Sequence, residues 1–317
     1  MRKIVNRERV EGRVYEHNLS MKVTGETSKH PGTNYINGTL DVATDEDCLN
    51  IVTVNFTYVT ETTSKGTKND TYNTLKNIIE SGKTILLDGK NAATMVRIDT
   101  ALGVNDFYTN RNGEEQLVSA KRNDGGFVHT ESKLGDETKR NFFECDMLIN
   151  GTRLVEADEE RHIPADYLIV KGAVFNFRNA ILPVEFVVKN PGGIKYFEAL
   201  EASPSNMVFT KVWGKIESQT IVDKREEESA FGEAIVKEYD RKVREWVITG
   251  TAKEPYEMGD EQTGITVDEI KQMLADRETY LADIKKRNEE WLAQRAAGNV
   301  ASQNVSAAPA AVGGFNF

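Results

Sequence analysis

Aromatic rings and ammonium groups share one side of a predicted strand in the second half of the chain. In the segment 207–215, Phe209, Lys211, Trp213 and Lys215 occupy alternate positions, opposite a row of Val and Thr. Alternate residues of an extended strand point to the same side of a sheet. Unpaired bases stack on aromatic rings, and the phosphates between them pair with Lys or Arg. The spacing therefore predicts a surface that binds single-stranded nucleic acid.

Two further segments of this half, 170–178 and 242–249, repeat the combination of rings and cations. A competing interpretation places the rings in the core or between two domains. The neighbouring lysines would then be buried at a cost in free energy, which favours the exposed surface. The residues that these segments add to the predicted surface are Lys171, Phe175, Phe177, Lys242, Arg244 and Trp246.

The first half of the chain shows a weaker form of the same pattern. Segment 105–113 predicts a hairpin with aromatic residues near its tip, a type of loop with which OB barrels grip ligands. Asp41 and Asp99 fall on the same predicted face and oppose binding of a polyanion, so we expect the tighter site in the second half. The predicted contacts of the first half are Arg13, Tyr15, Arg97, Phe107, Tyr108, Arg111, Lys121 and Arg122.

Motifs of catalysis are missing from the sequence. It contains no phosphate-binding loop, dinucleotide fingerprint, HExxH motif or nucleophile elbow. The four histidines stand alone, without a second ligand at zinc spacing. The acidic run Asp45–Asp47 lies between two predicted strands, where a solvated turn explains it. We therefore predict a protein that is not an enzyme and uses no cofactor or metal.

Composition limits the class of protein and its compartment. The length of 317 residues suits two domains with some chain left over. The formal net charge of −10 opposes nucleic-acid binding, although a strand senses the local field of a groove and not the sum over the molecule. No apolar run is long enough for a secretion signal or a membrane span. The two distant cysteines suit a reducing compartment, so we expect a cytoplasmic protein without a membrane partner.

The predicted elements occur in the same order in both halves. From residue 8 to 250 the chain reads as short strands of alternating polarity, with helical spacing only at 71–81 and 193–202. INGTL at 36–40 and VKGAV at 170–174 occupy matching places in the two halves. Each half thus has the order strand–strand–strand–helix–strand–strand, which is that of an OB barrel. We predict a mainly β protein with two tandem OB-like barrels, at 1–135 and 136–257; a single large β-sandwich is the alternative.

The chain changes character after the predicted barrels. Thr266 and Glu269 form a predicted capping box, followed by apolar residues at helical spacing to about Ala297. We expect an amphipathic helix within 258–297 that packs back on its own domain, with self-association as the alternative.

The last segment, 298–317, has no charged side chain and a composition typical of disorder. It carries two aromatic residues at its tip, Phe315 and Phe317, beside the terminal carboxylate. A flexible tether with such a tip suits capture in the pocket of a partner protein. The alternative is an inert end.

Several segments resemble one known family. They are INGTLDVATDEDCLNIVTVNFTYV (36–59), RNDGGFVHT (122–130), VFTKVWGKI (208–216), EWVITGTAKEPYE (245–257) and the terminal AAPAAVGGFNF. In these the chain resembles the OB-fold single-stranded DNA-binding proteins of tailed bacteriophages that infect Gram-positive bacteria. The resemblance implies a protein that coats exposed DNA during phage replication and recombination in the host cytoplasm. Bacterial relatives recruit replication enzymes through an acidic tail tip; this tail keeps the terminal Phe but lacks the aspartates.

Two other classes of protein stay open from the sequence. One is a virion or tail structural protein built of β-sandwiches, which would not bind nucleic acid. The other is a recombination mediator that anneals strands. Comparison of single-stranded and duplex DNA of equal length separates the structural protein from the DNA-binding classes.

Overall fold

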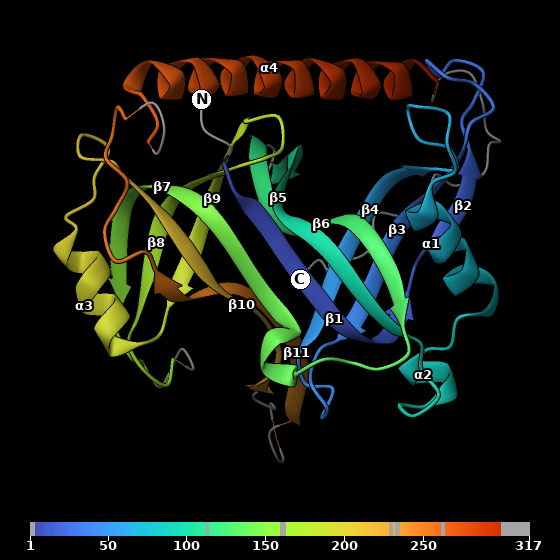
Figure 1. The fold of residues 1–317 in the computed structure, drawn as a ribbon, viewed down its shortest axis with the longest axis horizontal. Coiled ribbons are helices and arrows are strands. Elements are labelled where there is room, and N and C mark those ends of the chain that lie inside the picture. Colours follow the sequence, from blue (N-terminus) through green and yellow to red (C-terminus); the bar gives the residue numbers. More distant parts are fainter. Residues whose placement is uncertain are drawn as a thin grey trace.

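The computed structural model describes residues 4–111, 114–158, 163–227, 231, 235–260 and 264–298 (Figure 1).

The strands in the first half of the chain pair in an order that returns to the first strand. The pairing order is β1–β3–β4–β6–β5–β1, in which the β4–β6 contact is parallel and the others are antiparallel. These strands are β1 (Asn6–His17), β3 (Asn34–Ala43), β4 (Ile51–Thr60), β5 (Met95–Arg111) and β6 (Glu114–Glu131); β2 (Ser20–Val23) pairs with β3, and α1 (Asp70–Ser81) and α2 (Ile85–Asp88) lie between β4 and β5.

The second half repeats this order. Its pairing runs β7–β8–β9–β11–β10–β7, with a parallel contact between β9 and β11. We call these two closed pairing orders the first cycle (β1, β3, β4, β5 and β6) and the second cycle (β7, β8, β9, β10 and β11). Antiparallel pairing of β1 with β7 joins the two cycles into one sheet. The elements are β7 (Asn141–Val155), β8 (Tyr167–Phe175), β9 (Ile181–Val188), α3 (Pro191–Ala199), β10 (Val208–Glu227) and β11 (Ile235–Thr251).

The repeated glycine of the two halves has a common structural reason. A Cβ at Gly38 would lie 1.9 Å from the carbonyl oxygen of Asn18, and one at Gly172 would lie 2.1 Å from that of Leu148. In each half the backbone of a preceding segment therefore occupies the space that a side chain would fill. Glycine is the residue that tolerates such a close approach.

A C-terminal helix, α4 (Val267–Gly298), lies across one end of both cycles (Figure 1). Thr266 and Glu269 cap it as predicted: the Thr266 amide donates to the Glu269 carboxylate at 2.9 Å, and the Glu269 amide donates to the Thr266 hydroxyl at 3.2 Å. The prediction of a mainly β chain that ends in a helix is confirmed. In the described part of the chain, no helix combines the length and apolarity needed to span a membrane.

The largest apolar cluster extends through both cycles. Its ring contacts join Phe143 to Phe186 at 5.2 Å and Phe186 to Trp246 at 5.6 Å, measured between ring centroids. Burial of this apolar surface is the main stabilisation of the joined sheet. The two cycles therefore share a core as well as a seam of backbone hydrogen bonds.

One carboxylate is buried in the seam between the cycles. Glu8 lies on β1, opposite Thr100 of β5 and Phe143 of β7, and is 2% exposed. Neither of its carboxylate oxygens has a hydrogen-bond partner of good geometry within the described residues, because the nearby Thr100 hydroxyl donates to the backbone carbonyl of Asp124. Burial, together with the nearby Asp124 carboxylate, raises the pKa of Glu8 well above its ordinary 4.5. Burial therefore favours the neutral form of this side chain in the folded protein.

We expect Glu8→Gln to stabilise the protein at alkaline pH. A raised folded-state pKa means that folding takes up a proton, so the contribution of Glu8 is fully present below pH 4.5 and is lost as the pH rises through the folded pKa. A tenfold difference in proton affinity between the folded and unfolded states corresponds to about 1.4 kcal/mol, so the stability advantage of the variant should grow as the pH rises. Urea unfolding from pH 5 to 9 measures this, with the exposed Glu16→Gln on the same strand as control. Parallel pH profiles of the wild type and Glu8→Gln would mean that Glu8 is ionised in the folded state.

Candidate nucleic-acid interface

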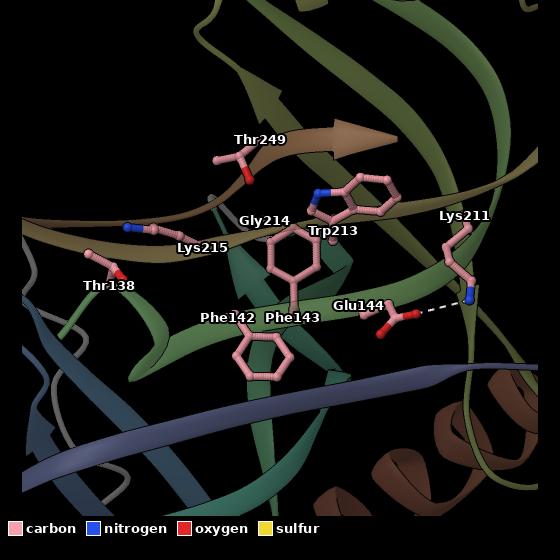
Figure 2. Close-up of a pocket in the computed structure, with 9 residues that line it drawn as sticks. All are labelled: Thr138, Phe142, Phe143, Glu144, Lys211, Trp213, Gly214, Lys215 and Thr249. Atoms are coloured by element: carbon pink, nitrogen blue, oxygen red, sulfur yellow. Dashed lines mark ion pairs between the residues drawn. The ribbon is translucent and has the colours of Figure 1, made fainter. Parts of the chain in front are cut away.

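An open groove of about 420 Å³ lies on the outer face of the second cycle, beside its seam with the first. Figure 2 shows the indole of Trp213 along one side of the groove and Phe142 on the other. The indole is 42% exposed, which leaves ring surface available to a ligand. The groove is lined by Thr138, Phe142, Phe143, Glu144, Lys211, Trp213, Gly214, Lys215 and Thr249.

Glycine on the neighbouring strand makes room for the indole. Trp213 of β10 pairs with Gly250 of β11, and a Cβ at Gly250 would lie 2.4 Å from Nε1 of Trp213. The indole therefore rests against the β11 backbone, where a side chain would displace it. Trp213 points away from the core because side chains alternate along a strand and its neighbours Val212 and Gly214 are buried. The ring is thus held in place before a ligand arrives.

The charges of the groove are partly paired. Lys211 forms an ion pair with Glu144 at 2.9 Å, drawn in Figure 2, and Arg7 of β1 pairs with the same carboxylate. The hydrogen bond that Lys211 donates to the Glu144 carboxylate raises the pKa of Lys211. Although burial opposes it, hydrogen bonds from Lys211 and Arg7 lower the pKa of Glu144. Lys215 is exposed and forms no ion pair among the described residues, so its ammonium group can meet a phosphate directly.

The residues that β1 and β7 contribute here were not predicted from the sequence. The guanidinium of Arg9 lies 5.9 Å from the ring centroid of Phe142 and 3.0 Å from Asp99. Arg7 and Arg9 point outward because Glu8 and Val10, between and after them, are buried. This alternation is visible in the sequence and could have placed both arginines on the outer face. The pairing of β1 with β7, which brings them to the groove, is not visible there.

Two of the predicted stacking rings are buried, so their assignment to the exposed surface is wrong. Phe175 is 1% exposed and Phe209 is fully buried. Both lie on the outer side of the cycle, but the segment that leads into α4 covers this side. Phe209 packs against Phe175 at 6.1 Å and against Tyr256 at 5.2 Å. The covering residues include Tyr256, Met258, Ile265, Ile270 and Met273.

Trp246 is also buried, at 3% exposure, and this prediction is corrected as well. Its ring packs on Phe186 in the shared core, and its Nε1 donates to Oδ1 of Asn123 in the first cycle at 3.1 Å. A partner on another cycle satisfies the indole N–H, which allows the ring to be buried without a hydrogen-bonding penalty. Trp246 thus joins the two halves and offers no face to a base.

Three predicted cations meet in a second hollow, between the two cycles. Lys121 and Arg122 come from β6, and Arg244 comes from β11. This cleft is also lined by Val52, Thr53, Asn55, Asn123, Ile216, Ser218, Glu245 and Trp246. The sequence predicted these cations for a binding surface, and the structure brings residues of both halves to one place.

The remaining predicted residues line neither hollow. Arg97 pairs with Asp99 and Glu131, at 3.3 and 2.9 Å, and Lys171 pairs with Glu185 at 3.5 Å. Phe177 is exposed, with the guanidinium of Arg178 5.2 Å from its ring centroid. The other residues in this group are Arg13, Tyr15 and Tyr108, which are half-buried, and Phe107, which is exposed.

Four further predicted residues cannot be placed at the interface. Arg111 lies at the end of β5 and Lys242 lies in β11, but their side chains are outside the described residues. Phe315 and Phe317 also lie outside the described part of the chain.

No curated protein sequence matches the chain. Among solved structures, it is similar to the wild-type single-stranded DNA binding protein from Thermus aquaticus, with 12% identity, a TM-score of 0.44, and coverage of 83% of this chain and 98% of that one. A deletion variant of that protein is 11% identical, with a TM-score of 0.44 and coverage of 82% and 99%. The model of the YorF family matches residues 5–287, which is most of the sequence, so the chain belongs to the YorF family.

Proposed function

We propose that this chain binds single-stranded DNA independently of sequence and catalyses no reaction on it. Each strand cycle serves in this proposal as one OB-type barrel, within 1–135 and 136–257, and the helical region 258–297 corresponds to α4 (Val267–Gly298). The pairing order, with the helix between the third and fourth strands of each cycle, supports this division because it is the connectivity of an OB barrel.

The Trp213 groove carries the proposal. It combines an exposed, braced indole with the second ring Phe142 and with the ammonium group of Lys215. Stacking of one base on such a ring contributes about 1–3 kcal/mol, and it tolerates any base because each has a π-face. A duplex hides these faces between its base pairs, so a groove of this kind selects unpaired strands.

Ion pairs in the groove bear on the expected salt dependence. Glu144 and Asp99 already hold Arg7, Arg9 and Lys211, so the local field is weaker than the number of cations alone implies. Phosphates that pair with Lys215 would still release counterions, and the logarithm of the binding constant should fall with the logarithm of the salt concentration. Stacking then provides a larger share of the affinity than in a strongly basic protein.

The biological setting within this proposal follows from the sequence resemblance. We place the protein in replication and recombination of phage DNA, in the cytoplasm of the bacterial host. The terminal segment 298–317, with Phe315 and Phe317, would recruit a replication or recombination protein. Its aromatic tip and lack of charge support capture in an apolar pocket.

A titration with oligo(dT) and with duplex DNA of equal length tests the function. We expect oligo(dT) to quench tryptophan fluorescence and to shift the protein in a native gel, with affinity that decreases as salt increases. The duplex should bind much more weakly. Equal binding of both DNAs, or of neither, would exclude the proposed function and favour a structural role.

A further inference from the structure

The cleft between the two cycles presents cations from both halves of the chain to one small space. Lys121 and Arg122 reach it from β6, and Arg244 reaches it from β11. Arg122 is ion-paired with Asp124. Within the residues that the structure describes, neither Lys121 nor Arg244 forms an ion pair with a carboxylate. Two positive charges in this cleft therefore have no opposite charge in direct contact.

Neutral groups hold these two side chains in place. Nζ of Lys121 donates to the backbone carbonyl of Glu185 at 2.7 Å and lies 5.5 Å from the ring centroid of Trp246. A guanidinium nitrogen of Arg244 donates to the hydroxyl of Thr53 at 3.0 Å. Each of these contacts crosses from one cycle to the other. The cations are thus positioned only when the two halves are joined.

The ammonium group of Lys121 is partly buried and is therefore incompletely hydrated. Burial lowers the pKa of Lys121, although the carboxylates of Glu185 and Glu245 act in the opposite direction. An anion that enters the cleft would compensate for the lost hydration, because a charged group gains most from an opposite charge where water is scarce.

Size and lining separate this cleft from the Trp213 groove. Its cavity volume is about 30 Å³, against about 420 Å³ for the groove. A water molecule needs roughly 10–15 Å³ by this kind of measure, so the cleft admits a group of a few heavy atoms but not a base. The one ring at the cleft, Trp246, is buried and cannot stack on a ligand. The cleft therefore fits a phosphate group.

We propose that Lys121 and Arg244 together bind a backbone phosphate of single-stranded DNA in the cleft between the two cycles. This inference rests on the proposed function and adds a contact separate from the stacking groove. In the β10–β11 ribbon, Ser218 pairs with Arg244 and Ile216 with Trp246, whereas Lys215 of the groove pairs with Val247. Because the sides of a ribbon alternate, the two hollows lie on opposite sides of it.

The test is the salt dependence of oligo(dT) binding by the variant Lys121→Gln/Arg244→Gln. Losing one phosphate contact should reduce the slope of log K against log salt by about 0.7. The affinity at low salt should fall by about tenfold, as expected for loss of hydrogen bonds to a charged group. Quenching of Trp213 at saturation should stay unchanged, because the stacking groove is intact. Lys195→Gln/Arg153→Gln removes two exposed cations outside both hollows and should leave slope and affinity near the wild-type values.

The outcomes distinguish this inference from the proposed function. If the wild-type protein fails to bind oligo(dT), the proposed function is wrong. If it binds and the cleft variant matches the control variant in slope and affinity, the phosphate site is wrong. Arg244 is exposed, so Arg244→Gln alone is expected to fold and to change the slope in the same direction. An unchanged slope in the folded single variant would also overturn the proposal.

Discussion

Trp213→Ala is expected to weaken binding of oligo(dT) by roughly 5- to 150-fold, which corresponds to about 1–3 kcal/mol of lost stacking. The indole lies in the groove at 42% exposure and is braced by Gly250, so its loss removes a preorganised platform and not a core side chain. The fold should therefore survive the substitution. Fluorescence anisotropy with labelled oligo(dT) measures the affinity, and circular dichroism checks the fold. Trp213→Phe should recover most of the affinity because it restores a flat ring.

Trp291→Ala supplies a matched control for this result. Trp291 is 52% exposed, lies on α4 and is not among the residues that line the groove. Its removal costs the protein a ring of similar exposure but should leave the affinity for oligo(dT) unchanged. If Trp291→Ala weakened binding and Trp213→Ala did not, the strand would have to bind along α4 and the groove assignment would be wrong.

Arg277→Ala is expected to destabilise the fold by about 3–5 kcal/mol, because it leaves a buried carboxylate without its counter-charge. Arg277 of α4 and Asp106 of β5 form an ion pair at 2.8 Å, and their side chains are 9% and 1% exposed. Ser119 donates a further hydrogen bond to Asp106 at 2.6 Å. Urea unfolding measures the change in the free energy of unfolding.

Two comparisons separate this effect from ordinary surface charge. Lys286 pairs with Glu290 on the exposed side of α4 at 4.0 Å, and Lys286→Ala should change stability by no more than about 0.5 kcal/mol. The double variant Asp106→Leu/Arg277→Met removes both charges and should recover most of the lost stability. If Arg277→Ala were as stable as the wild type, the ion pair between Arg277 and Asp106 would not anchor α4.

The anchored helix also determines which aromatic rings remain exposed to solvent. Ile270 and Met273 of α4 lie in the same apolar cluster as Phe175 and Phe209, so the first turns of the helix and the segment before it complete a second core. Phe175 of β8 and Phe209 of β10, which would otherwise face solvent, are therefore buried in this second core. Trp213, further along β10, lies beyond this cover and stays exposed.

Local sequence patterns determined the elements and their order. Alternating polarity identifies strands because side chains of a strand point to two sides, and this periodicity survives in β1, β3 and β4 as alternating burial. The caps of α1, α3 and α4 depend on residues within a few positions of the helix start: Asn69, Asn190 and Thr266 each accept a hydrogen bond from a nearby backbone amide. The recurrence of strands and one helix in both halves is therefore readable from the chain alone.

Only the tertiary structure decided which side of each strand meets solvent. The pattern assigned Phe175 and Phe209 to the side opposite the shared core, but Tyr256, Met258, Ile265, Ile270 and Met273 cover that side. Trp246 is buried because Asn123, more than a hundred residues earlier, accepts its N–H. Arg7 and Arg9 reach the Trp213 groove because β1 pairs with β7. Alternation along a strand separates its two faces, whereas their exposure depends on contacts between residues far apart in the chain, which local spacing does not encode.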